Sequence, residues 1–147
     1  MTAPSPARIR TVLGTAVLLT TLAELFYLTV WGVWLFPQGS LTGKVVWTLT
    51  CGLAMGAVIG AGTLVWVEPR HRGLAALWRA AVIVAAVDSY CALLCSRIDA
   101  RFGFFGGAEN SGLFIAAGVL PALAGGALYG WLLYRRNPTP TFSDGPG

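Results

Sequence analysis

Two acidic residues stand inside long apolar stretches of the sequence. Glu24 is the only charged residue between Arg10 and Lys44, and Asp88 lies halfway along the apolar stretch 77–97. A carboxylate at the centre of a bilayer is costly unless it faces protein, water or a partner. The two acids could share a proton, or bind a proton or a cation in a transport cycle. Alternatively, each is held by hydrogen bonds and only fixes the packing of its helix.

Polar side chains accompany both acids at short spacing. Thr20, Thr21 and Tyr27 lie three or four residues from Glu24, so a helix would place all four on one polar stripe. Tyr90 follows Asp88 by two residues and could donate a hydrogen bond to it. We therefore take these neighbours, together with the two acids, as candidates for a polar core or for a proton or cation site.

The three cysteines all lie within apolar stretches, at Cys51, Cys91 and Cys95. An odd number gives no complete disulfide framework. Cys91 and Cys95 are one helical turn apart, where the Cβ directions are poor for a disulfide, so buried packing residues are favoured over a redox pair. His71 is the only histidine, and nucleotide-binding, zinc-protease and serine-hydrolase motifs are absent. We expect no metal, no cofactor and no enzymatic activity.

The composition indicates that these residues are carried by membrane-spanning helices. Of 147 residues, 56% are hydrophobic and only 11% charged, against about 25% charged in a soluble domain. A span needs about 20 apolar residues, and four stretches qualify, at about 9–36, 44–67, 77–97 and 111–134. We expect an all-α, integral membrane four-helix bundle as one domain over 9–136, in a bacterial inner membrane. A disordered tail at 1–8 and a flexible tail at 137–147 would flank it.

Basic residues predict the orientation of this bundle. Seven would lie on the side of the two termini, against three on the other side, namely Lys44, Arg97 and Arg101. Because Lys and Arg are retained on the cytoplasmic side, both termini are predicted to be cytoplasmic. The net charge of +4 is not gathered into a basic stripe, so the lipid bilayer is an expected partner and nucleic acid is not.

Glycines on two of the predicted spans indicate close packing between helices. Gly52, Gly56 and Gly60 form a GxxxGxxxG run on the second span, and such runs let another backbone approach closely. The fourth span carries Gly118, Gly125 and Gly126. These faces could pack inside the bundle, against a second copy or against another membrane subunit, and their number favours a partner.

Three functions remain open from the sequence. The absence of catalytic motifs and the glycine faces favour a non-catalytic accessory or oligomerising subunit of a larger membrane assembly. The alternative is a proton-coupled carrier of a small solute, which uses Glu24 and Asp88. In its four spans and in Glu24 the chain resembles the small multidrug-resistance carriers, but Asp88 and the long loop 98–110 depart from that pattern, and we assign no family. A membrane thiol oxidoreductase using Cys91 and Cys95 is the weaker alternative.

Overall fold

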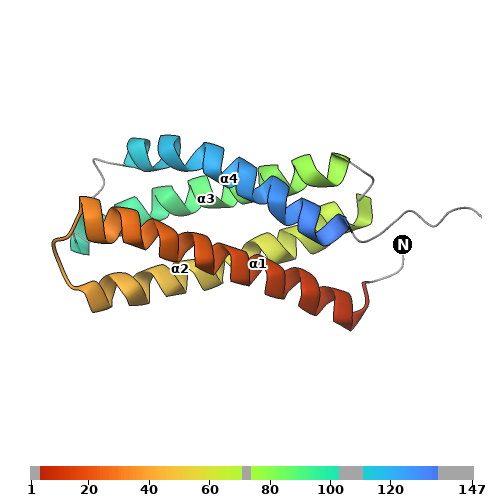
Figure 1. Cartoon of the computed structure of the whole chain (residues 1–147), viewed down its shortest axis with the longest axis horizontal. Coiled ribbons are helices and arrows are strands. Elements are labelled where there is room, and N and C mark those ends of the chain that lie inside the picture. The colour runs from red at the N-terminus through yellow and green to blue at the C-terminus, as the bar shows by residue number, and fades with distance from the viewer. Residues whose placement is uncertain (1–3, 71–73, 103–110, 136–147) are drawn as a thin grey trace, which may run out of the picture.

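The computed structural model describes residues 4–70, 74–102 and 111–135, which form two antiparallel helical hairpins lying side by side (Figure 1). In these residues, four helical segments are long and apolar enough to cross a membrane, which confirms the predicted all-α fold with four candidate spans. The first hairpin consists of α1 (Pro6–Tyr27), continued by the π-helix η1 (Leu28–Leu35), and α2 (Leu41–Gly62), continued by the π-helix η2 (Thr63–Val67) and the short 3-10 helix η3 (Glu68–Arg70). The second hairpin consists of α3 (Leu74–Phe102) and α4 (Ser111–Tyr134).

The helix ends correct two of the predicted boundaries. The predicted disordered tail 1–8 is wrong for residues 6–8, because α1 begins at Pro6 and the Ser5 hydroxyl caps it by accepting from Arg8 N at 3.2 Å. Residues 98–102 were expected in a loop but extend α3, since this stretch contains neither glycine nor proline. The rest of that loop and the tail 137–147 lie outside the described residues.

A buried lysine stabilises the end of the first candidate span. In η1 the backbone follows the wider π-helical pattern, and Phe36 N donates to Trp31 O at 2.8 Å. Lys44 is only 1% exposed, and its ammonium group donates to Gly32 O at 2.7 Å and to Phe36 O. It thus satisfies carbonyl groups that a helix end leaves without partners. The sequence had placed Lys44 only as a charge that sets the orientation.

Glycines bring the two helices of each hairpin into backbone contact. A Cβ at Gly56 would lie 2.5 Å from Val17 Cα, and the neighbouring α2 glycines also face α1. In the second hairpin, a Cβ at Gly126 would lie 2.6 Å from Ala81 Cα. The GxxxGxxxG run is therefore occupied by α1 of the same chain. Contact is extensive within each hairpin and sparse between α1 and α4.

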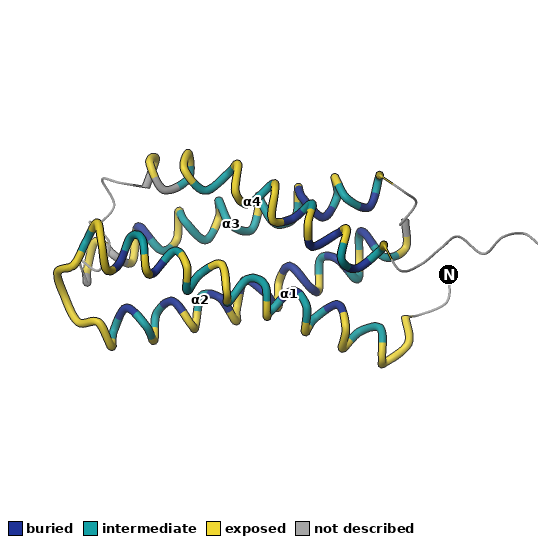
Figure 2. Tube along the Cα trace, viewed as in Figure 1, coloured by how far each residue is buried: buried dark blue, intermediate teal, exposed yellow. Residues whose placement is uncertain are grey.

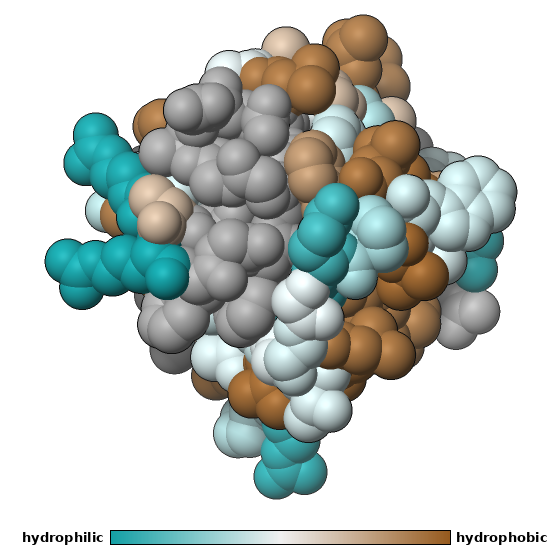
Figure 3. Space-filling view, turned by 90° about the vertical axis from the view of Figure 1, so that its left-hand side faces the viewer, coloured by the Kyte–Doolittle hydropathy of each residue, from teal (hydrophilic) through white to brown (hydrophobic). Residues whose placement is uncertain are grey.

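The two hairpins are joined by a hydrophobic core near the end of the bundle where α1 begins and α4 ends, which we call the termini end (Figure 1). All four helices contribute to this core, which consists of Val12, Ala16, Ile59, Ala80, Tyr129 and Leu133. Burial is concentrated on the inner faces of the helices, and the outward faces are exposed (Figure 2). At the opposite end of the bundle, hydrophilic side chains project from the rim and hydrophobic residues cover the flanks (Figure 3).

Adding one methyl group at Gly56 tests the backbone contact between α1 and α2. We expect Gly56→Ala to destabilise the bundle by about 1–3 kcal/mol, because the new Cβ meets backbone that has to move. Gly14→Ala is the matched control, since a Cβ at Gly14 meets nothing within 4 Å. Unfolding of both variants in detergent, followed by circular dichroism, measures the difference. Equal stability of the two variants would contradict this packing.

Candidate functional site

A cavity of about 380 Å³ lies between the two hairpins. Its floor is formed by Ala16, Ile59 and Tyr129, which also belong to the hydrophobic core near the termini end. From there the lining extends towards the opposite end, as far as Trp31 on η1 and Trp47 on α2. The core therefore closes the cavity on the side of the termini.

Both mid-span acids line this cavity, although they come from different hairpins. Glu24 belongs to α1 and Asp88 to α3, so each hairpin contributes one carboxyl group to the cavity. The Asp88 carboxylate lies over Gly118 of α4, where its Oδ2 is 2.9 Å from the position that a Cβ would take. Gly118 thus provides the space that the Asp88 carboxyl group occupies. Among the described residues of the lining, the two acids are the only charged ones.

Of the polar residues that the sequence analysis grouped with the two acids, some line the cavity and others do not. Thr20 and Tyr27 line the cavity with Glu24. Thr21 faces α2 instead, close to Gly52, and its buried Oγ1 has no hydrogen-bond partner in the described part of the chain. Tyr90 is 63% exposed and absent from the lining, because two residues along a helix turn the side chain by about 200°. The predicted polar stripe is therefore narrower than expected.

The structure contains a close pair of cysteines that the sequence analysis did not predict. All three line the cavity, and Cys51 Sγ on α2 lies 3.6 Å from Cys95 Sγ on α3, within hydrogen-bonding distance for two thiols. The close pair thus joins the two hairpins and is not the pair Cys91 and Cys95 of a single helix. Among the described residues, no group of three or more His, Cys, Asp and Glu side chains is arranged to hold a metal ion.

The cavity opens sideways between α1 and α4. Its lining includes exposed residues of both helices, among them Phe26 of α1, which is 72% exposed, and Pro121 and Gly125 of α4. A Cβ at Gly125 would meet nothing within 4 Å, so Gly125 borders open space and does not pack against another helix of this chain. If the four helices span a membrane, this opening faces the hydrocarbon of the bilayer.

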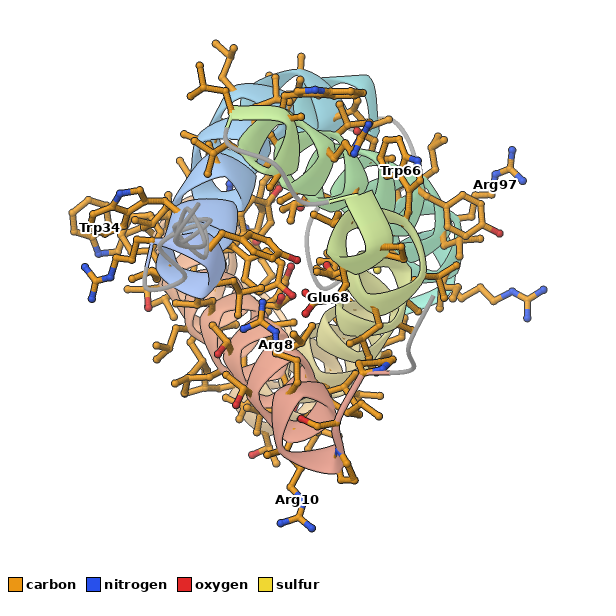
Figure 4. The ribbon with its side chains drawn as sticks, turned by 90° about the vertical axis from the view of Figure 1, so that its right-hand side faces the viewer. Arg8, Arg10, Trp34, Trp66, Glu68 and Arg97 are labelled. Atoms are coloured by element: carbon orange, nitrogen blue, oxygen red, sulfur yellow. The ribbon has the colours of Figure 1, made fainter. Side chains whose placement is uncertain are left out.

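A polar network that the sequence analysis missed holds the termini end together. Arg8 forms a bidentate ion pair with Glu68, in which the Nε–Oε1 distance is 2.7 Å and the Nη2–Oε2 distance is 3.0 Å. The Tyr134 hydroxyl donates to Glu68 Oε2 at 2.9 Å, and the Arg8 guanidinium also lies 5.2 Å from the centre of the Tyr134 ring. Arg8 and Glu68 point towards each other between the helices, whereas Arg10 points away (Figure 4). The sequence offered one indication of this ion pair, because Glu68 is an acid at the end of the bundle where most basic residues were predicted.

Comparison of the chain with protein-family models, with curated proteins and with solved structures finds no match. The site is therefore interpreted from its own geometry. It combines two carboxyl groups, a thiol pair and an aromatic wall in a single cavity that is closed at the termini end and open at one side.

Removal of the Arg8 side chain charge tests whether this network closes the bundle. We expect Arg8→Gln to cost about 1–3 kcal/mol of stability, between the values for surface and buried ion pairs, because both partners are mostly buried. Arg10→Gln is the matched control on the same helix and should have little effect. In a double-mutant cycle, Arg8→Gln combined with Glu68→Gln should cost less than the sum of the single changes. If the two costs are additive, the interaction between Arg8 and Glu68 contributes nothing to the stability of the bundle.

Proposed function

We propose that this protein is a proton-coupled membrane carrier of a small, partly apolar, basic solute. The observation that carries this proposal is that Glu24 and Asp88, from different hairpins, line the same cavity near the middle of the candidate spans. Ionisable groups at such positions are costly, and they commonly mark the path of an ion or a proton.

The charge and the wall of the cavity favour a cationic solute. In the part of the lining that the structure describes, only the two acids carry charge, so an anionic solute would be repelled. Tyr27, Trp31 and Trp47 provide aromatic faces, which attract ammonium-type cations. A cavity of about 380 Å³ also lies within the range of about 300–1,000 Å³ that is usual for small-molecule sites.

The same two carboxyl groups can couple solute to protons. In an apolar cavity without a cation, carboxyl groups are favoured in the protonated, neutral form. A bound cation favours the carboxylate form, so binding of solute would release protons and binding of protons would release solute. Exchange of the two ligands across the membrane is then a proton-coupled antiport.

The direction of access follows from the closed end. We infer that the bundle spans a bacterial inner membrane with both termini in the cytoplasm, because Lys and Arg are more numerous at that end. The hydrophobic core and the Arg8–Glu68 network would then close the cytoplasmic side in this conformation. A lipophilic amine could enter from the bilayer through the opening between α1 and α4.

The accessory-subunit alternative loses its main structural support. It relied on glycine faces that would be available to another protein, and the α2 run is filled by α1 of the same chain. On α4, Gly126 contacts α3, and Gly118 accommodates Asp88. The two acids in one cavity favour the carrier instead.

Neutral variants of the two acids test the carrier directly. We expect Glu24→Gln and Asp88→Asn to weaken tetraphenylphosphonium binding at least about tenfold, or about 1.4 kcal/mol, and to abolish its proton-driven uptake into proteoliposomes. Both variants should remain folded, because Gln and Asn have nearly the same size as the protonated acids and introduce no charge. Tyr90→Phe, which changes an outward-facing residue, is the control and should bind and transport normally. Unchanged binding in both acid variants would reject the carrier.

The coupling predicts a pH dependence of definite sign. Tetraphenylphosphonium binding should weaken as the pH falls, because protons compete with the cation for the carboxylates. The dependence should become flatter in Glu24→Gln and Asp88→Asn, which have fewer groups to protonate. Calorimetric titrations of the purified protein over a series of buffers measure both effects. Binding of the same strength at all pH values would contradict coupling to protons.

A further inference from the structure

The thiol pair lies at a contact between the two hairpins. Cys51 belongs to the first hairpin and Cys95 to the second, and their sulfur atoms are 3.6 Å apart. A disulfide requires about 2.05 Å, so the two sulfurs would have to move closer by about 1.5 Å. Both residues are only partly buried and line the cavity. None of the three cysteines is in a disulfide in this structure.

The remaining cysteine shows why this pair is distinctive. Cys91 lies on the same wall of the cavity, one helical turn before Cys95. Two cysteines one turn apart on a continuous helix have Cβ atoms that are poorly directed towards each other. Cys51 approaches Cys95 from the neighbouring helix instead, as the two residues of a disulfide between packed helices must.

We propose that Cys51 and Cys95 form a redox-active dithiol, which a lipid-soluble quinone oxidises to a disulfide that joins α2 to α3. In this reaction the two S–H bonds break and one S–S bond forms. The two electrons and two protons pass to the quinone oxygens, so that one quinone becomes one hydroquinone. No other oxidant is required.

The surroundings of the thiols determine the class of oxidant. Both sulfurs lie within candidate spans, on a cavity whose described opening lies between α1 and α4. An oxidant that reaches them from the bilayer has to dissolve in hydrocarbon and accept two electrons together with two protons. A quinone has these properties, and its flat ring suits the aromatic side chains of the cavity wall, such as Trp31 and Trp47.

This reaction is independent of the proposed transport of cations. It needs the thiols and the opening of the cavity, whereas transport needs the two acids. A disulfide would also tie the hairpins together covalently, so it would restrict any movement of one hairpin against the other.

The reaction can be measured on the full-length protein in lipid nanodiscs. The reduced protein is incubated without oxygen with a short-chain ubiquinone, remaining thiols are counted by alkylation and intact mass, and quinone reduction is followed by absorbance. We expect the wild type and Cys91→Ser to lose two thiols and to reduce one quinone per chain. Cys51→Ser and Cys95→Ser should reduce none, and peptide mapping of the wild type should link Cys51 to Cys95. Circular dichroism verifies that each variant is folded.

Three results would overturn the proposal. The first is that Cys51 and Cys95 stay fully alkylatable in excess quinone. The second is that Cys51→Ser and Cys95→Ser reduce as much quinone as the wild type. A disulfide that peptide mapping assigns to Cys91 would count equally against the proposal. The third is that diamide, used in a parallel sample, forms the disulfide while the quinone does not, which would reject a quinone as the oxidant. Glu24→Gln should behave as the wild type in this assay, so a failed carrier and a failed dithiol remain distinguishable.

Discussion

Backbone contact at glycines is the constraint on which the rest of this structure depends. Gly56 lets α2 approach the backbone of α1 at Val17, and Gly126 lets α4 approach the backbone of α3 at Ala81. Helices packed in this way lie close together along the glycine contacts. The cavity that holds the two acids lies between the hairpins, where α1 and α4 have little contact.

The two ends of the bundle meet the same physical requirement in different ways. Helix ends and charged groups need partners wherever water is excluded. At the termini end, Glu68 satisfies Arg8 and receives a hydrogen bond from Tyr134, which connects α1, η3 and α4. Near the opposite end, Lys44 satisfies carbonyl groups of η1 and the residue that follows it. The first arrangement closes the bundle beneath its core, and the second stabilises only the first hairpin.

The cavity gains its chemical character because each hairpin contributes to it. One carboxyl group and one thiol come from the first hairpin, and the partner of each comes from the second. A movement of one hairpin relative to the other would change both distances together. The proposed exchange of protons for a cation would use the two acids, and the proposed oxidation would use the thiol pair of the same cavity. Neither property requires a soluble domain or a bound metal.

The sequence alone determined the all-α fold, the four candidate spans and the positions of Glu24 and Asp88 near the middle of those spans, because length and hydrophobicity are local properties of the chain. Helical periodicity also placed Thr20 and Tyr27 correctly beside Glu24. Periodicity failed where the answer depended on how a helix is rotated against its neighbours. It put Thr21 on the same stripe and made Tyr90 a neighbour of Asp88, and it could not show that Cys51 lies beside Cys95.

Only the tertiary structure brought together residues that are distant in the chain. Arg8 meets Glu68 across 60 positions, and Cys51 meets Cys95 across 44. The spacing of residues within one helix says which of them share a face, but it does not say which faces of two helices meet. That choice was made by the glycine contacts, since they fix the rotation of each helix within its hairpin and leave the acids and thiols facing the space between.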